Sequence, residues 1–209
     1  MVKYVKEVST ELHRAYVVQF LNSMMQIIKG VTRSMDYTIE LGTINDIDEL
    51  EHLYDDMNDY LERTTNYPGW KKGVYPVREN AIEGIYEKCL FVARINGRIA
   101  GSIILNHKQE PVYEKAECGI QASGAEVFVV HTFVVHPEFI RNKVGNMLMN
   151  FCLSYGREQG MRAIRLDVYE HNQPAIMLYK KCGFIYRSTV DLGLSEYGLD
   201  WFQLYEYIL

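Results

Sequence analysis

Several features that would place the chain in a particular class of protein are missing from its sequence. No apolar run approaches the roughly 18 residues that a membrane-spanning helix needs. The longest apolar stretch near the start, Ala15–Leu21, is interrupted by Gln19, and no small-residue cleavage site follows it. We therefore expect neither a secretory signal nor a membrane span. No GxGxxG segment follows a strand pattern, which argues against a Rossmann dehydrogenase.

Positive charge and closely spaced cysteines are also scarce. The 22 lysine and arginine residues are outnumbered by 27 acidic residues, and the formal net charge is −5. Non-specific binding to nucleic acid needs clustered cations, so we expect no nucleic-acid partner. No two cysteines form a CxxC pair, so we expect no metal site and free thiols in a reducing, cytoplasmic compartment. The four cysteines are Cys89, Cys118, Cys152 and Cys182.

The composition is that of a globular protein with a core. Hydrophobic residues make up 48% of the 209 residues and charged residues 23%. Residues 4–28 have apolar positions at helical spacing and predict a helix, and a strand pattern then begins at residue 36. We therefore expect an N-terminal helical extension over residues 1–34 and one α/β domain over residues 35–209. The extension is either an added helix or sequence upstream of the true start.

Strand and helix patterns alternate along this domain. The dipeptide Asn96-Gly97 between two alternating apolar runs is a strong hairpin signal. Residues 106–124 are polar and rich in turn formers, so we expect a loop there. The predicted strands cover residues 36–41, 89–95, 98–105, 125–135, 163–169, 184–190 and 201–208, and the predicted helices cover residues 43–63, 79–87, 144–159 and 174–182.

The stretch from Leu166 to Phe184 carries the sharpest functional signal. It reads as a strand, a polar turn and a helix, with Pro174 suited to the first helical turn and Gly183 to the left-handed position after the last. Asn172 lies at the mouth of the turn, where its side chain can cap the helix or hold a ligand amide. Ala175 and Tyr179 are four residues apart, so they share one face of the helix.

This stretch resembles the second signature of the GNAT acetyltransferase family, Asn-x-x-Ala-x-x-Leu-Tyr-x-x-x-Gly-Phe. Every position of that pattern is matched, by Asn172, Ala175, Leu178, Tyr179, Gly183 and Phe184. The resemblance covers residues 36–209 and implies an α/β (α+β) fold with a mixed, strongly twisted sheet flanked by helices. Two central strands of that sheet would splay to admit acetyl-CoA, the cosubstrate. It also implies transfer of the acetyl group to an amine.

The resemblance further implies where acetyl-CoA binds. The pantetheine arm would pair with the backbone at the end of the strand over residues 125–135, and the pyrophosphate with the loop and helix start that follow. That loop departs from the family pattern Arg/Gln-x-x-Gly-x-Gly/Ala. Counted from Ile140, only Gly145 matches; counted from Arg141, Val144 and Asn146 replace both glycines. The expected cofactor-binding residues are Phe133, Val134, Val135, Arg141, Asn142, Lys143, Val144, Gly145, Asn146, Asn172, Ala175 and Tyr179.

Lys143 takes the place of a glycine in this loop, and two readings of its neighbourhood remain open. A Cβ at position 143 is tolerated if the backbone is helical there, and Arg141 and Lys143 then supply charge to the phosphates. Alternatively both cations are solvated and have no ligand. The second reading would leave the affinity for acetyl-CoA low while the fold is kept.

Four side chains are candidates for acid–base chemistry. Tyr179 is expected to act as the general acid, because a phenol with a pKa near ~10 is still protonated at neutral pH. The candidates for the general base are Glu126, His131 and Asp167, of which the last matches a position where some family members carry a catalytic carboxylate. For each of these three a structural hydrogen bond is the alternative, and a water relay can replace a single base.

The acceptor is expected at the other end of the cleft, near the aromatic loop over residues 67–76. Trp70 and Tyr75 offer flat surfaces that can hold a cation or an aromatic group, or they simply pack within the loop. We thus expect an N-acetyltransferase acting on a small-molecule or peptide amine. A GNAT-fold module that binds acyl-CoA without turnover is the alternative. The sequence is compatible with a homodimer.

Overall fold

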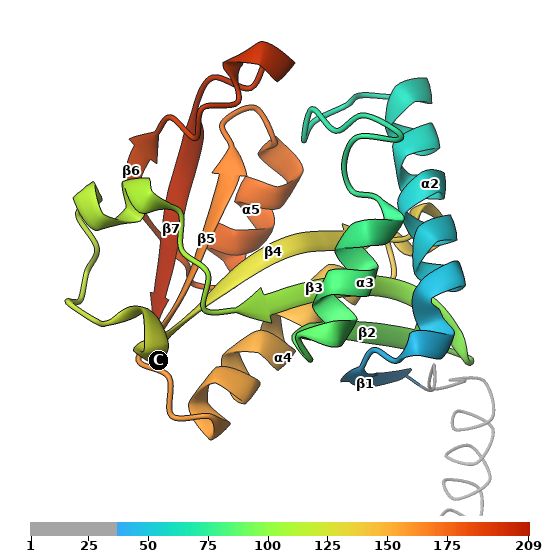
Figure 1. Cartoon of the computed structure of the whole chain (residues 1–209), viewed down its shortest axis with the longest axis horizontal. Helices are drawn as coiled ribbons and strands as arrows, with labels where there is room; N and C mark the ends of the chain where they lie inside the picture. Colours follow the sequence, from blue (N-terminus) through green and yellow to red (C-terminus); the bar gives the residue numbers. More distant parts are fainter. Residues whose placement is uncertain (1–36) are drawn as a thin grey trace, which may run out of the picture. The chain divides into compact units, whose positions relative to one another are not determined.

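The computed structural model describes residues 37–209, without the side chains of residues 114 and 115. The predicted helix over residues 4–28, and the extension over residues 1–34, lie outside the described residues. One seven-stranded sheet with the order β1-β2-β3-β4-β5-β7-β6 runs through the described part (Figure 1). The strands are β1 (Tyr37–Leu41), β2 (Leu90–Ile95), β3 (Arg98–Asn106), β4 (Val127–Val135), β5 (Ala163–Tyr169), β6 (Ile185–Val190) and β7 (Phe202–Ile208). The longer helices are α2 (Ile47–Arg63), α3 (Arg78–Tyr86), α4 (Val144–Glu158) and α5 (Gln173–Lys181).

The hairpin between β2 and β3 forms where the sequence predicts it. Asn96 and Gly97 both have positive φ, 51° and 81°, as a type I′ turn requires. The right-handed twist of such a turn matches that of the strands it joins, so β2 and β3 pair along their length. Figure 1 shows the accumulated twist, because β2 and β3 run across the view while β7 runs up and down it.

Neighbouring strands are antiparallel everywhere in this sheet except at β4 and β5. These two pair in parallel over four positions, from Val127 opposite Ala163 to Val130 opposite Leu166, and the pairing then ends. Beyond that point β4 continues with β3 as far as Val135, while β5 continues with β7. The two central strands therefore separate at His131 and Asp167, which we call the divergence point (Figure 1). The splayed strands expected from the family resemblance are confirmed.

A β-bulge lies on β4 at the divergence point. Ser102 pairs with Val134 and Ile104 with His131, so Thr132 and Phe133 together face one residue of β3. Thr132 has a φ of 41°, an unusual value for a β-branched residue. The extra residue reverses the alternation of side chains, so that Val134 packs on the face to which His131 also points.

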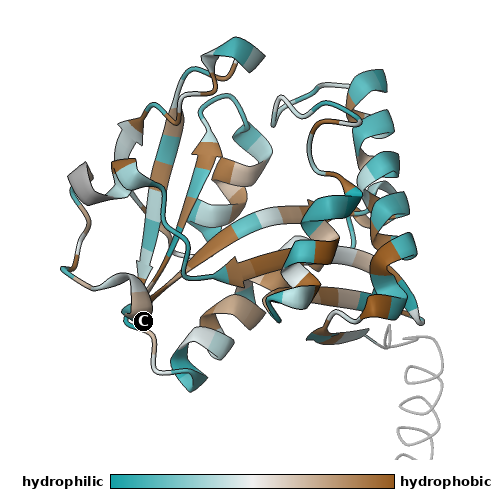
Figure 2. Ribbon diagram, in the orientation of Figure 1, coloured by the Kyte–Doolittle hydropathy of each residue, from teal (hydrophilic) through white to brown (hydrophobic). Residues whose placement is uncertain are grey.

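The two faces of the sheet are covered by different layers. On one face α4 and α5 pack against apolar side chains of every central strand, and the buried residues there include Leu148, Ile164 and Ile176. On the other face α2 and α3 lie in front of β2 and β3 (Figure 1), with Leu50 and Leu53 of α2 among the buried residues. Figure 2 shows the result, with hydrophobic residues concentrated in β3 and β4 and hydrophilic residues along α2.

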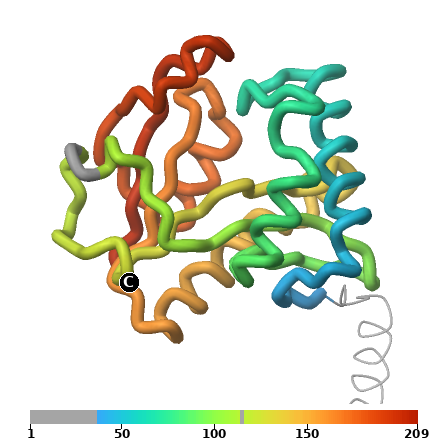
Figure 3. The backbone as a smooth tube through the Cα atoms, viewed as in Figure 1, coloured from blue at the N-terminus to red at the C-terminus, as the bar shows by residue number. Residues whose placement is uncertain are grey.

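The segment between β3 and β4 contains more regular structure than the loop that the sequence predicts, and it packs on the sheet. It contains two short 3₁₀ helices, η2 (Pro111–Lys115) and η3 (Gly124–Glu126). Tyr113 of η2 is only 3% exposed and packs with Val129 of β4 and Leu204 of β7. Figure 3 shows this yellow-green segment crossing the red strand β7. The segment therefore covers the part of the sheet that α2 and α3 leave open.

A buried ion cluster holds this segment in place. Glu206 of β7 is fully buried, and its carboxylate lies 3.0 Å from the Nε of Arg165 and 3.0 Å from the Nε of Arg187. The same carboxylate accepts a hydrogen bond of 2.6 Å from the backbone N–H of Gly119. A Cβ at Gly119 would lie 2.0 Å from Nη2 of Arg187, so any larger residue there would force the Arg187 guanidinium to move.

All four cysteines are free thiols, as the sequence predicts. Cys89 and Cys152 are buried, and burial raises the pKa of the Cys89 thiol to about 11. Within residues 37–209, no helix combines the length and the apolar character that crossing a bilayer requires.

The buried cluster gives a prediction about stability. Glu206→Gln removes the negative charge and leaves two guanidinium groups uncompensated, so it should lower the free energy of unfolding by about 3–5 kcal/mol. The matched control is Glu138→Gln, which breaks an ion pair of 3.0 Å with Arg98 in which both side chains are more than half exposed. It should cost less than about 1 kcal/mol. Urea denaturation measures both, and equal losses would contradict the prediction.

Candidate active site

The divergence point brings together polar side chains from five separate elements. Two come from β4 and one from β5, and the others come from η2, from the loop between α2 and α3, and from α5. They are His131, Thr132, Asp167, Tyr113, Tyr75 and Tyr179. Within the described residues no three His, Cys, Asp or Glu side chains converge in the manner of metal ligands. The titratable groups that these six residues contribute are a carboxylate, an imidazole and phenols.

Asp167 lies on the face of β5 that the segment before β4 covers. Oδ2 of Asp167 accepts a hydrogen bond of 2.5 Å from the hydroxyl of Tyr113. Burial raises the pKa of Asp167, although the Tyr113 hydrogen bond and the nearby His131 oppose that shift. A carboxylate with a raised pKa binds a proton more readily, which suits a general base.

His131 is held in one tautomer by the backbone. Its Nε2 lies 3.0 Å from the carbonyl oxygen of Lys108, and because a carbonyl only accepts, Nε2 carries the hydrogen. In the neutral ring Nδ1 is then left as an acceptor. The half-buried ring of His131 lies close enough to Asp167 for its charged form to favour the carboxylate anion.

Tyr75 reaches the divergence point from the loop between α2 and α3. Its hydroxyl lies 2.8 Å from Oγ1 of Thr132, so the loop is tied to the bulge of β4. Burial raises the pKa of Tyr75, and the charge of Asp167 adds to the effect. Trp70 packs edge-on against the ring of Tyr75 with centroids 5.6 Å apart. Of the two aromatic residues singled out in the sequence, Tyr75 contacts the site and Trp70 supports it.

Tyr179 approaches the divergence point from the opposite face of the sheet. It is 5% exposed, and its ring lies among those of Phe133, Phe184 and Tyr205. Burial raises the pKa of Tyr179 well above its usual value, and the charge of Asp167 adds to the rise. In the described part of the chain no side chain is hydrogen-bonded to its hydroxyl. The Tyr179 hydroxyl therefore stays protonated at neutral pH and can donate a hydrogen bond to a ligand.

The motif residues around Tyr179 hold α5 in place. Oδ1 of Asn172 accepts from the backbone N–H of Ala175 at 3.4 Å, which caps the helix as predicted. Gly145 of α4 serves the same packing, since a Cβ there would lie 3.1 Å from Leu178 and 3.5 Å from Phe133. The glycine that matches the family pattern thus allows α4 and α5 to approach each other.

The structure shows the backbone at Lys143, on which the tolerance of a Cβ was conditional. A helical backbone would accept the Cβ without strain, but this residue is left-handed, with φ 62° and ψ 14°. It forms the N-cap of α4, and its side chain makes no capping hydrogen bond. The first N–H groups of α4, at Val144, Gly145 and Asn146, consequently have no intrahelical acceptor. Such groups, with the exposed side chains of Arg141 and Lys143 beside them, suit an anion.

Glu126 lies away from the divergence point. It ends η3, one residue before β4, instead of lying on the strand as we expected. Its carboxylate accepts from the backbone N–H of Ser123 at 2.8 Å and from its hydroxyl at 2.9 Å, and the backbone hydrogen bond is the main cause of a lowered pKa. Roughly 16 Å of extended strand separates it from His131. Its position and partners fit a structural role.

Sequence reasoning missed Tyr113 and Thr132. Tyr113 lies in a polar segment without periodicity, so nothing local indicates that its ring is buried against β4 and β7. Thr132 fits an ordinary strand pattern, and the bulge depends on how β3 and β4 pair. The only available hint was the length of the segment over residues 106–124, since long connections often carry function.

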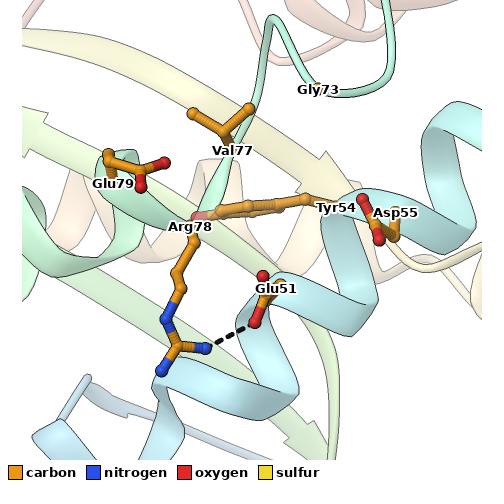
Figure 4. Close-up of a pocket in the computed structure, with 7 residues that line it drawn as sticks. All are labelled: Glu51, Tyr54, Asp55, Gly73, Val77, Arg78 and Glu79. Atoms are coloured by element: carbon orange, nitrogen blue, oxygen red, sulfur yellow. Dashed lines mark hydrogen bonds and ion pairs between the residues drawn. The ribbon is translucent and has the colours of Figure 1, made fainter.

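A separate pocket lies between α2 and α3, with a volume of about 250 Å³ (Figure 4). Arg78 pairs with one acidic residue of the lining, since its guanidinium lies 2.5 Å from Glu51, and it also lies 2.7 Å from Asp48 outside the lining. The pocket is lined by Glu51, Tyr54, Asp55, Gly73, Val77, Arg78 and Glu79. It shares none of these residues with the divergence point, so it gives no reason to place the acceptor there.

The left-handed backbone at Lys143 gives a prediction. Lys143→Gly removes the Cβ that opposes a positive φ and should raise the free energy of unfolding by about 1 kcal/mol or less, because glycine also loses more chain entropy. Lys143→Ala is the matched control, since it removes the same charge but keeps the Cβ, and it should leave stability within about 0.5 kcal/mol. Thermal unfolding compares the three proteins, and an equal effect of both changes would refute the backbone argument.

Solved structures share this fold. An acetyltransferase of the GNAT family from Streptococcus agalactiae superposes with a TM-score of 0.68 at 20% identity, over 83% of this chain and 95% of that chain. One from Listeria monocytogenes gives 0.66 at 17% identity, over 85% and 97%. The Salmonella typhimurium protein yncA, solved with its cofactor acetyl-CoA, gives 0.59 at 14% identity, over 83% and 94%.

Sequence comparison identifies the family to which the chain belongs. An uncharacterized N-acetyltransferase of Methanocaldococcus jannaschii is 28% identical over 143 residues, which is 65% of this chain. The alignment spans 59% of that relative's length. The model of the Acetyltransferase (GNAT) family matches residues 50–184, a range that contains both the divergence point and the complete motif from Asn172 to Phe184. The chain belongs to the GNAT acetyltransferase family.

Proposed function

We propose that this protein transfers the acetyl group of acetyl-CoA to a primary amine. The observation that carries the proposal is the divergence point, where the charge of Asp167 is near enough to raise the pKa of Tyr179 on the opposite face of the sheet. One group can take a proton from the attacking amine, and the other can give a proton to the leaving sulfur. An N-acyl transfer needs both events.

The chain offers two backbone sites for acetyl-CoA. On β4, the edge that faced β5 is unpaired from His131 onward, so the backbone of Phe133, Val134 and Val135 is available to the pantetheine arm. The N–H groups of Val144, Gly145 and Asn146, which have no acceptor within α4, would bind the pyrophosphate together with Arg141 and Lys143. Acetyl-CoA, once bound, supplies the activated acetyl group.

The same geometry suggests how the chain's own groups would act. Asp167 would accept the proton of the amine, because burial raises its pKa towards the working range of a base. His131 remains the second candidate, since its Nδ1 is left as an acceptor and its ring lies near enough to Asp167 to affect the pKa of that carboxyl group. Tyr179 would hold its proton until negative charge develops on the departing sulfur, because burial raises its pKa.

The acceptor would enter from the face opposite α4 and α5. Tyr75 lies on that face, fixed to Thr132, and would form the wall nearest the reacting amine. The loop that carries it also approaches the connection between β6 and β7, since a Cβ at Gly69 would lie 2.3 Å from Leu199. These two loops would therefore select the acceptor together, with Trp70 as support behind Tyr75.

The first test asks for binding and turnover separately. Acetyl-CoA at 100 times its Kd should stabilise the folded protein by about 2.7 kcal/mol, which corresponds to a rise in Tm of roughly 5–10 °C. A panel of primary amines, followed by release of free thiol, should then identify at least one substrate. Stabilisation without turnover on any amine would favour the non-catalytic binding module. The absence of any thermal shift at millimolar acetyl-CoA would contradict the proposal.

The second test concerns Tyr179. Tyr179→Phe keeps the packing of the ring and removes only the hydroxyl, so kcat should fall by roughly 10²–10⁴-fold. The KM for acetyl-CoA should change little, because the proton is needed mainly as charge develops in the transition state. Steady-state kinetics at saturating acetyl-CoA measure both values. An unchanged kcat, with the chemical step shown to limit the rate, would remove Tyr179 from the mechanism.

A further inference from the structure

The segment between β3 and β4 places a buried phenol directly on the candidate base. The side chain of Tyr113 is 3% exposed, and its hydroxyl donates to Oδ2 of Asp167 at 2.5 Å. Hydrogen bonds of an O–H to a carboxylate fall in this range and are about twice as strong as those between neutral groups. No motif points to this residue, and the proposed function does not use it.

The hydrogen bond occupies only one oxygen of the carboxylate. Within residues 37–209, Oδ1 of Asp167 has no hydrogen-bonding side-chain partner, and the residue is half-buried rather than enclosed. A carboxylate held through Oδ2 has lost its freedom to rotate about its χ2 angle. Oδ1 is thereby kept in one orientation and left available to accept a proton.

The hydroxyl of Tyr113 does not transfer its proton to the carboxylate of Asp167. Burial and the adjacent negative charge of Asp167 raise the pKa of Tyr113 well above its usual value, so its hydroxyl remains a donor while Asp167 is ionised. The hydrogen bond therefore has one polarity, with the proton on Tyr113. This is the arrangement that keeps the carboxylate as a base.

The rest of the segment between β3 and β4 holds the Tyr113 side chain in place. Its ring packs with Val129 and Leu204, and four residues beyond η2 the backbone of Gly119 donates to the buried Glu206. Arg165 ties the same segment to β5, because its guanidinium donates to Gln109 at 2.6 Å and to the carbonyl of Ile120 at 3.2 Å. Contacts on both sides of η2 thus determine where the phenol lies.

We propose that Tyr113 is a positioning residue that orients the Asp167 carboxylate for proton transfer from the acceptor amine, and that the segment over residues 107–126 is built to hold it there. This inference rests on the proposed function, in which Asp167 is the base. Other groups also face Asp167: His131 from β4, Glu110 from the start of the same segment, Tyr75 from the loop before α3, and Tyr179 from α5.

The experiment compares Tyr113→Phe with the unaltered protein across pH. The variant keeps the buried ring and removes the donor, so kcat/KM for the amine should fall about 10- to 100-fold, as expected for loss of a hydrogen bond to a charged group. Because that bond favours the charged carboxylate, its loss should also move the acid limb of the pH profile to higher pH. The KM for acetyl-CoA should stay the same.

Two further variants separate positioning from a general loss of structure. Tyr207→Phe also removes a phenol, one that lies 3.2 Å from Nη2 of Arg157 and away from Asp167, and it should leave the pH profile unchanged. In an Asp167→Asn background, Tyr113→Phe should cause no further fall in kcat/KM, because the two residues act as a unit. An additional fall in that background would overturn the proposal.

A carboxyl-carbon NMR titration of Asp167 requires no turnover, so it distinguishes failure of this inference from failure of the proposed function. Assigned with Asp167→Asn, the Asp167 signal should titrate at higher pH in Tyr113→Phe than in the unaltered protein. If that shift occurs but no amine is acetylated, the hydrogen bond stands and the proposed function fails. If Tyr113→Phe leaves both the titration and kcat/KM unchanged, Tyr113 has no positioning role.

Discussion

The early end of the parallel ladder between β4 and β5 is the constraint on which the site depends. A backbone that stops pairing leaves polar groups that need other partners. On the β5 side β7 continues the sheet, and on the β4 side the edge beyond Val130 is left for a ligand. The bulge at Thr132 accompanies this separation and turns one hydroxyl towards Tyr75. The positions of the side chains at the divergence point therefore depend on the separation of the backbones of β4 and β5.

The site is also asymmetric across the sheet. One face carries the closely packed helices α4 and α5, with Tyr179 enclosed by aromatic rings. The other face carries separate pieces of chain, the loop with Tyr75 and the segment with Tyr113. A hydrogen bond to Thr132 ties the loop to β4, whereas several side-chain hydrogen bonds, the Glu206 cluster and the packing of Tyr113 hold the segment. Packed helices therefore form one side of the divergence point and loops form the other, and loops are where enzymes of one fold differ in specificity.

Local chemistry explains which parts of the molecule were predictable. The Asn96-Gly97 turn and the cap of α5 by Asn172 depend on residues a few positions apart, so the sequence predicts both correctly. The role of Tyr113 depends on partners 54 residues away in Asp167 and further away in Leu204. At Lys143 the surrounding loop, not the local sequence, decides the backbone, because it holds at a positive φ a residue whose Cβ resists that conformation.

The position of Glu206 near the end of the chain has a consequence for the order of folding. Gly119 and Glu206 are 87 residues apart. The central part of the sheet is also incomplete without β7, which pairs with β5 along its whole length. Contacts of such separation form late, since the loop that they close must first lose its entropy. During synthesis the segment that carries Tyr113 emerges well before β7 and cannot dock until that strand arrives. Asp167 and its hydrogen-bond partner Tyr113 are consequently fixed in place only after β7 has joined the sheet.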